Sequence, residues 1–182
     1  MISQGIVQRR FETAVSLGDL VTTMKGLASV RVHQYRRTMR ALDASTLALD
    51  RAARALLHLR PDLATPRPGR EPSSTIVVFG SDRGLCGAFN ERMARFAAND
   101  AAEIAAEGVP VRVLAVGRRA ARRLRSMGRA PDVLLPAPSS LGAVDTAVAD
   151  LLDLIGDDGR AGREGQLRLV YARPVGSTRF EP

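Results

Sequence analysis

The first 60 residues contain no proline and three glycines, Gly5, Gly18 and Gly26. Over this stretch small or apolar residues recur at alternating steps of four and three, a heptad seam that predicts one long coiled-coil-type helix. The seam consists of Val7, Phe11, Ala14, Gly18, Val21, Ala28, Val32, Tyr35, Met39 and Leu42, and Lys25 interrupts it with a charge. A helix of this length extends for about 80 Å. We therefore expect an arm, residues 1–60, whose seam needs a partner helix.

The remaining sequence predicts a linker followed by a second domain. Residues 61–74 contain four prolines, which favour a linker. Beyond it, short apolar runs alternate with helical patterns. The expected strands are 75–79, 109–116, 132–135 and 166–173, the expected helices are 88–107, 117–127 and a segment from Ser139 or Ser140 through Ile155, and 156–165 is expected to be a loop. This alternation predicts a doubly wound, mostly parallel α/β domain over residues 75–182.

Composition limits the classes of partner. The chain carries 27 Lys and Arg against 19 Asp and Glu, a net charge of +8, and Lys25 is its one lysine. This balance favours acidic partners, whether nucleic acid, an anionic membrane surface or an acidic protein. A single cysteine excludes an internal disulfide framework. The sequence shows no secretory signal and no apolar run long enough to span a bilayer, so we expect a soluble, cytoplasm-facing protein.

The most distinctive local motif is GSDRGLCGAFN, residues 80–90, between a predicted strand and a predicted helix. Open α/β sheets bind ligands at such places, but the motif matches neither the P-loop nor the dinucleotide fingerprint, and we favour a structural turn. Cys86 lacks an evident base, because the two histidines, His33 and His58, lie in the arm. We therefore expect a packed, non-catalytic Cys86, with no catalytic residue, metal site or cofactor.

An arginine-rich helix offers one further hypothesis. The pairs Arg118/Arg119 and Arg122/Arg123, with Arg125, form a basic face that suits phosphate contacts, as in a nucleic-acid-binding module. No aromatic residues interleave with them to stack bases. We favour the alternative, a solvated outer face with Ala120, Ala121 and Leu124 packed inward.

Two stretches together resemble the gamma subunit of rotary ATP synthases. Gln8-Arg9-Arg10 followed by Leu20–Val30 is similar to the start of that family's N-terminal helix. Ser81-Asp82-Arg83-Gly84-Leu85-Cys86-Gly87-Ala88-Phe89-Asn90 is similar to its Ser-Asp-Arg-Gly-Leu-Cys-Gly-x-x-Asn signature. Leu169–Tyr171 through Phe180–Pro182 resembles the last strand of its α/β domain and the segment after it. The resemblance covers nearly the whole chain.

The resemblance implies a rotor without bond chemistry of its own. Its N-terminal helix would form half of a shaft inside the hexameric head of alpha and beta subunits. Its α/β domain would dock on the epsilon subunit and the membrane c-ring, at the cytoplasmic face of a bacterial plasma membrane. Met24, Lys25, Arg9 and Arg10 would lie on the side that contacts the head, and no nucleic acid would be bound.

The printed sequence differs from that pattern in one respect. The family's C-terminal helix, which pairs with the N-terminal one, does not follow Pro182, so we expect a shortened form that cannot support normal torque coupling alone. The segment around Thr23-Met24-Lys25 and Gln34-Tyr35 is similar to the alternative, N-type bacterial ATPases. An unpaired seam also predicts that the chain can associate with its own copy.

Overall fold

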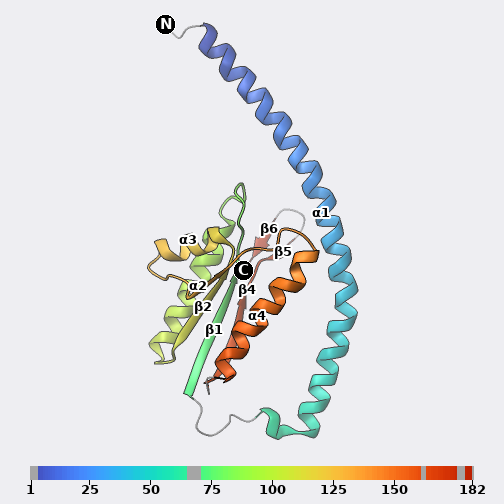
Figure 1. Ribbon diagram of the computed structural model, residues 1–182, viewed down its shortest axis with the longest axis vertical. Coiled ribbons are helices and arrows are strands. Elements are labelled where there is room, and N and C mark those ends of the chain that lie inside the picture. The colour runs from blue at the N-terminus through green and yellow to red at the C-terminus, as the bar shows by residue number, and fades with distance from the viewer. Residues whose placement is uncertain (1–3, 65–70, 161–162, 176–178, 182) are drawn as a thin grey trace. The chain divides into compact units, whose positions relative to one another are not determined.

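The computed structural model describes residues 4–64, 71–160, 163–175 and 179–181 (Figure 1). The chain divides into two compact units, Met1–Thr65 and Pro66–Pro182.

The first unit is built on one long helix. Helix α1 runs from Gln4 to Leu59, 56 residues, a length of about 84 Å at about 1.5 Å per residue. The short 3-10 helix η1, Pro61–Ala64, follows directly. Helix α1 ends before Pro61 because a residue that precedes proline is disfavoured in the α conformation. Within the unit, Arg60 donates hydrogen bonds to Asp62 and thereby lowers the pKa of that carboxyl. The predicted long helix is confirmed.

The seam of α1 is exposed to solvent along its length. Apolar side chains that stand at least two-fifths exposed include Val7, Phe11, Val21, Val32, Met39 and Leu42. Tyr35 is the one side chain of α1 that is partly buried among those the structure describes. An isolated helix in water gains little from such a surface, since most helical stability in proteins comes from packing an apolar face.

The second unit contains a parallel sheet of four strands in the order β3-β2-β1-β4. The strands are β1 (Glu71–Phe79), β2 (Val111–Val116), β3 (Val133–Leu135) and β4 (Arg163–Val170). A separate antiparallel pair joins β5 (Arg173–Val175) to β6 (Arg179–Glu181).

Helices cover both faces of this sheet. Helices α2 (Phe89–Ala106) and α3 (Arg118–Ser126) bury a core around Ile76, Val78 and Val113 on one face. Helix α4 (Gly142–Arg160) packs on the other face, over Val77, Leu114 and Val116. Because neighbouring residues of a strand point to opposite faces, the continuous apolar run of β1 serves both cores. The predicted doubly wound α/β fold is confirmed.

The start of β1 differs from the sequence prediction. Strand β1 begins at Glu71, inside the predicted linker, even though it includes Pro72. The N–H of Ser74 donates toward the β2 side, to the carbonyl of Pro110, and a residue two positions earlier faces the same side. Pairing with β2 starts only at Ser74, so Pro72 removes no ladder hydrogen bond.

The predicted loop at 156–165 is wrong for most of its length. Helix α4 continues to Arg160, and β4 begins at Arg163. The glycines suggested a loop, but a helical glycine costs only about 1 kcal/mol relative to alanine. Gly165 has a different reason: a Cβ there would lie 2.5 Å from the backbone oxygen of Ser73, so close approach of β4 to β1 requires glycine.

Candidate functional site

The signature loop, Ser81–Gly87, lies at the carboxyl end of β1. From β1 the sheet continues to β2 and β3 on one side and to β4 on the other, so the strand order reverses here. Ligands of open α/β proteins bind at such a switch point. The geometry of the loop therefore decides between a ligand site and a structural role.

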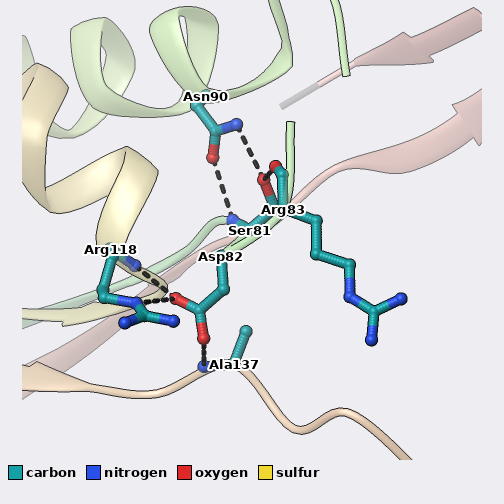
Figure 2. Close-up of polar contacts among 6 residues, drawn as sticks. All are labelled: Ser81, Asp82, Arg83, Asn90, Arg118 and Ala137. Carbon is teal, nitrogen blue, oxygen red and sulfur yellow. Dashed lines mark hydrogen bonds and ion pairs between the residues drawn. The ribbon is translucent and has the colours of Figure 1, made fainter. Parts of the chain in front are cut away.

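Asp82 connects the loop to two other segments (Figure 2). One carboxylate oxygen accepts a 2.7 Å hydrogen bond from the backbone N–H of Arg118, at the start of α3. The other accepts a 3.1 Å hydrogen bond from the backbone N–H of Ala137, in the segment between β3 and α4. The guanidinium of Arg118 also lies 3.5 Å from the first oxygen. A negative charge is favoured at a helix N-terminus, so Asp82 stabilises α3 as well as joining it to the loop.

Asn90 fixes the other side of the loop (Figure 2). Its side-chain oxygen accepts a 2.9 Å hydrogen bond from the N–H of Ser81, and its amide nitrogen donates a 2.9 Å hydrogen bond to the hydroxyl of Ser81. Asn90 is buried in the first turn of α2, so this pair ties the start of α2 to the end of β1. The predicted turn is thus held by the side chain of Asp82 within it and by the side chain of Asn90 at the start of α2.

Two glycines permit this close packing. Gly117 has φ of 105°, and a Cβ there would lie 2.8 Å from the backbone nitrogen of Ser81. A Cβ on Gly80 would lie 2.3 Å from the Cβ of Ala120. Both contacts bring α3 against the loop, where the backbone N–H of Arg119 donates to the carbonyl of Ser81. Most polar groups of this motif therefore form hydrogen bonds within the fold, and its glycines allow close contacts there.

Cys86 is exposed, so the prediction of a packed cysteine is wrong. Its thiol donates to the carbonyl of Gly84 at 3.3 Å and lies 3.6 Å from the hydroxyl of Ser81. Gly87, the next residue along the chain, has φ of 52°. The histidines belong to α1 in the other unit, and the described residues contain no cluster of side chains suited to a metal ion.

The tip of the loop carries its most accessible side chains. Leu85 and Arg83 are exposed, and the Arg83 side chain points away from the Asp82 and Asn90 contacts (Figure 2). The sequence motif indicated that the whole loop is distinctive, but it did not distinguish the exposed residues at the tip from the residues that point inward. Only the hydrogen bonds and exposures make that division.

The other predicted site residues lie on α1. Arg9, Arg10, Met24 and Lys25 are all exposed there. They belong to the first unit, whereas the signature loop belongs to the second.

Helix α3 presents the predicted basic face. Ala120, Ala121 and Leu124 are fully buried, while its arginines are exposed. The inward packing predicted for this helix is confirmed.

Comparison with known proteins gives a consistent result. A family model described as ATP synthase matches residues 4–182. The ATP synthase gamma chain of Granulibacter bethesdensis is 32% identical over 162 residues, which cover 85% of this chain and 53% of the relative. That of Nostoc sp. is 27% identical over 186 residues, covering 97% of this chain and 57% of the relative.

A third relative aligns over a shorter stretch. The ATP synthase gamma chain of Methylobacterium nodulans is 33% identical over 103 residues, covering 52% of this chain and 35% of the relative. The chain thus spans about half or less of the length of these curated relatives. Within the part of the chain that the structure describes, no helix is long and apolar enough to cross a membrane.

Proposed function

This chain belongs to the ATP synthase gamma family, and on that premise we propose that it acts as central-stalk rotor of a proton- or sodium-transporting ATP synthase. It would contact the alpha and beta subunits of the head, the epsilon subunit and the membrane c-ring. The chain itself would form and break no covalent bonds. Its rotation would favour different conformations at the catalytic sites of the head in turn, as a coupled population shift.

The observation that carries the proposal is the exposed seam of α1. Position d of the heptad is apolar in eight successive repeats: Val7, Ala14, Val21, Ala28, Tyr35, Leu42, Leu49 and Leu56. A helix of about 84 Å with such a seam is suited to pairing along a shaft rather than to folding onto a small domain. A shaft helix is the element that a central rotor needs.

The charge of α1 supports contact with an acidic head. Between Asp19 and Asp43 the helix carries Lys25, Arg31, Arg36, Arg37 and Arg40 and no acidic residue. These side chains are exposed, and the structure gives them no ion pair with a described residue. An acidic loop of the beta subunit would complement this stretch, and Arg9, Arg10, Met24 and Lys25 would lie on the same contact. A place at the cytoplasmic face of the bacterial plasma membrane follows from the same proposal.

Affinity capture from the native host tests the proposal. A tagged copy of the chain should recover alpha, beta and epsilon subunits from detergent-solubilised membranes. A charge placed in the seam should reduce the recovery of these subunits more than a charge placed outside it. Leu42→Lys, in the seam, is therefore compared with Leu47→Lys, outside it. Both leucines are more than half exposed, so neither change should disturb the isolated chain. We expect Leu42→Lys alone to reduce the recovery.

Recovery of none of the three subunits by the unchanged chain would contradict the rotor role. Recovery that is equally reduced by both substitutions would contradict the role of the seam. Nucleic acid in the captured material would instead support the alternative of a nucleic-acid-binding module. In that case the amount of bound nucleic acid should fall steeply as the salt concentration rises. The relatives named above are all gamma chains, which gives that alternative no support.

A further inference from the structure

We propose that the outer side of α3 is an interaction surface for the phosphate headgroups of an anionic phospholipid membrane. This surface, which we name the arginine face, consists of the exposed side chains of Arg118, Arg119, Arg122, Arg123 and Arg125. The inference rests on the place at the membrane proposed above, and it adds the residues that would meet the lipid.

Helix α3 separates its buried and its charged side chains completely. Ala120, Ala121 and Leu124 are fully buried against the sheet. The exposed residues of the helix are the five arginines and Ser126. Successive residues of a helix are about 100° apart around its axis, so Arg119 and Arg122 lie farthest from the buried side. The other three arginines flank them, and the whole outer half of the helix is therefore basic.

This charge pattern is unfavourable for the fold itself. Arg118 and Arg119 lie in the first turn, whose free N–H groups carry partial positive charge, and that turn contains no acidic residue. Arginines also stand three or four residues apart, as Arg122 does from Arg118 and Arg119, and such like-charge pairs destabilise a helix. A pattern that opposes local stability without a gain in packing points to a role outside the fold.

Carboxylates leave most of the arginine face without a counter-charge. Asp82 lies 3.5 Å from the guanidinium of Arg118, and the other four arginines form no ion pair with a described residue. The exposed acidic residues of α4 lie over the opposite face of the sheet, and they are Asp145, Asp150 and Asp153. The second unit thus has a basic side and an acidic side, so an anionic surface would attract it in one orientation.

The residue types of the arginine face favour lipid over other acidic partners. Protein interfaces concentrate apolar and aromatic side chains at their centre, and single-stranded nucleic acid stacks on aromatic ones. The exposed side of α3 contains neither kind. A lipid surface is a plane of phosphate groups, to which a guanidinium can donate two parallel hydrogen bonds, and it requires no apolar contact.

The contact would remain at the level of the headgroups. A helix that enters a bilayer needs a free apolar side, and that side of α3 is buried in the core. Clusters of four or more basic residues beside a membrane are typical of binding to anionic lipid, and each such residue raises the affinity about fivefold. Binding through the arginine face should therefore depend on charge and weaken as salt is added.

The test measures binding of the full chain to vesicles of equal parts phosphatidylglycerol and phosphatidylcholine. Arg122→Gln with Arg123→Gln removes two charges from the arginine face. Arg36→Gln with Arg37→Gln is the matched control, because these adjacent arginines of α1 are also exposed and form no ion pair with a described residue. We expect the α3 double variant to bind about tenfold more weakly or worse, and the control to stay within about threefold of the unchanged chain.

Two outcomes on vesicles would contradict the arginine face as a lipid site. One is equal weakening by the two double variants, which would show that only the total charge matters. The other is a difference between them that persists on vesicles of phosphatidylcholine alone, which carry no net charge.

Duplex DNA and the immobilised alpha–beta head are the competing probes. If the α3 double variant loses affinity for either of them while its binding to anionic vesicles is unchanged, lipid is the wrong partner. Thermal unfolding provides a further check. The α3 double variant should have a Tm equal to or above that of the unchanged chain, since it removes like-charge pairs. A clear fall in Tm would show that these arginines support the fold and would contradict the inference.

Vesicle binding and recovery of the head subunits are independent measurements. A chain that recovers alpha and beta subunits but does not bind anionic vesicles would contradict this inference alone. A chain that binds vesicles through the arginine face but recovers none of the alpha, beta and epsilon subunits would contradict the rotor role alone.

Discussion

At the residue scale, the signature motif divides into inward and outward members. Asp82 and Asn90 use their polar atoms on backbone and side-chain partners within the unit. Arg83 and Leu85 are exposed, and the Arg83 side chain points away from those contacts. The sequence pattern favoured a structural turn over a phosphate site, and the inward residues agree with that hypothesis. The outward ones could not be identified from sequence, because exposure and φ depend on the folded turn.

Asp82→Asn should destabilise the second unit. The amide keeps one acceptor oxygen but turns an N–H₂ group toward a backbone N–H that then lacks an acceptor. We expect a loss of about 1–3 kcal/mol in the free energy of unfolding. Urea denaturation checks this, with Asp153→Asn as the control, since Asp153 is exposed on α4 and makes no hydrogen bond to a described residue. Equal stability of the two variants would show that the carboxylate does not join the segments.

Gly117→Ala and Gly84→Ala should differ strongly. At Gly117 the φ of 105° disfavours any side chain, and the new Cβ would meet backbone atoms of Gly80 and Ser81. At Gly84 the nearest atoms belong to the flexible end of Arg119, which can move aside. We expect Gly117→Ala to cost more than about 2 kcal/mol and Gly84→Ala less than about 1 kcal/mol. Chemical denaturation of both variants measures these losses in the free energy of unfolding. Similar losses for the two variants would contradict the close approach of α3 to the loop.

At the element scale, prediction succeeded where a periodic pattern was long or a run was fully apolar. Helix α1 and the buried parts of β1 and β2 are of this kind. It failed at 156–165, where glycines suggested a loop. Gly165 is required by the approach of β4 to Ser73, a tertiary cause that no local pattern reveals.

Gly26→Ala should stabilise α1. Gly26 lies inside the helix, off the seam, and a methyl group added there would meet no atom within 4 Å, so alanine adds helix propensity without a clash. The gain is about 1 kcal/mol at an exposed position. Circular dichroism during thermal unfolding should show a later loss of helix than in the unchanged chain. An unchanged or earlier loss would mean that α1 is not continuous through this residue.

At the scale of the whole molecule, the exposed seam and the basic charge act in opposite directions on self-association. The seam can recruit a second copy of α1, as the sequence predicted. In a parallel pair, however, Arg31 of one copy would face Arg36 of the other, since these occupy neighbouring g and e positions. The net charge of +8 adds a general repulsion between copies. An acidic partner could cover the apolar seam and also neutralise the positive charge.

Salt should therefore change the two associations in opposite senses. Added salt screens the repulsion between copies, so self-association should strengthen from low to high ionic strength. The same screening should weaken binding to an acidic head. Sedimentation equilibrium of the chain alone and titration of the head at both salt concentrations measure the two effects. Self-association that weakens with salt would contradict the repulsion between arginine-rich arms.

Native mass spectrometry of the complex isolated from the host tests the central claim most directly. A rotor occupies the axis of its head, so the spectrum should show a single copy of this chain with each hexameric head of alpha and beta subunits. Several copies per head, or a chain that is recovered only with itself or with nucleic acid, would contradict the rotor role.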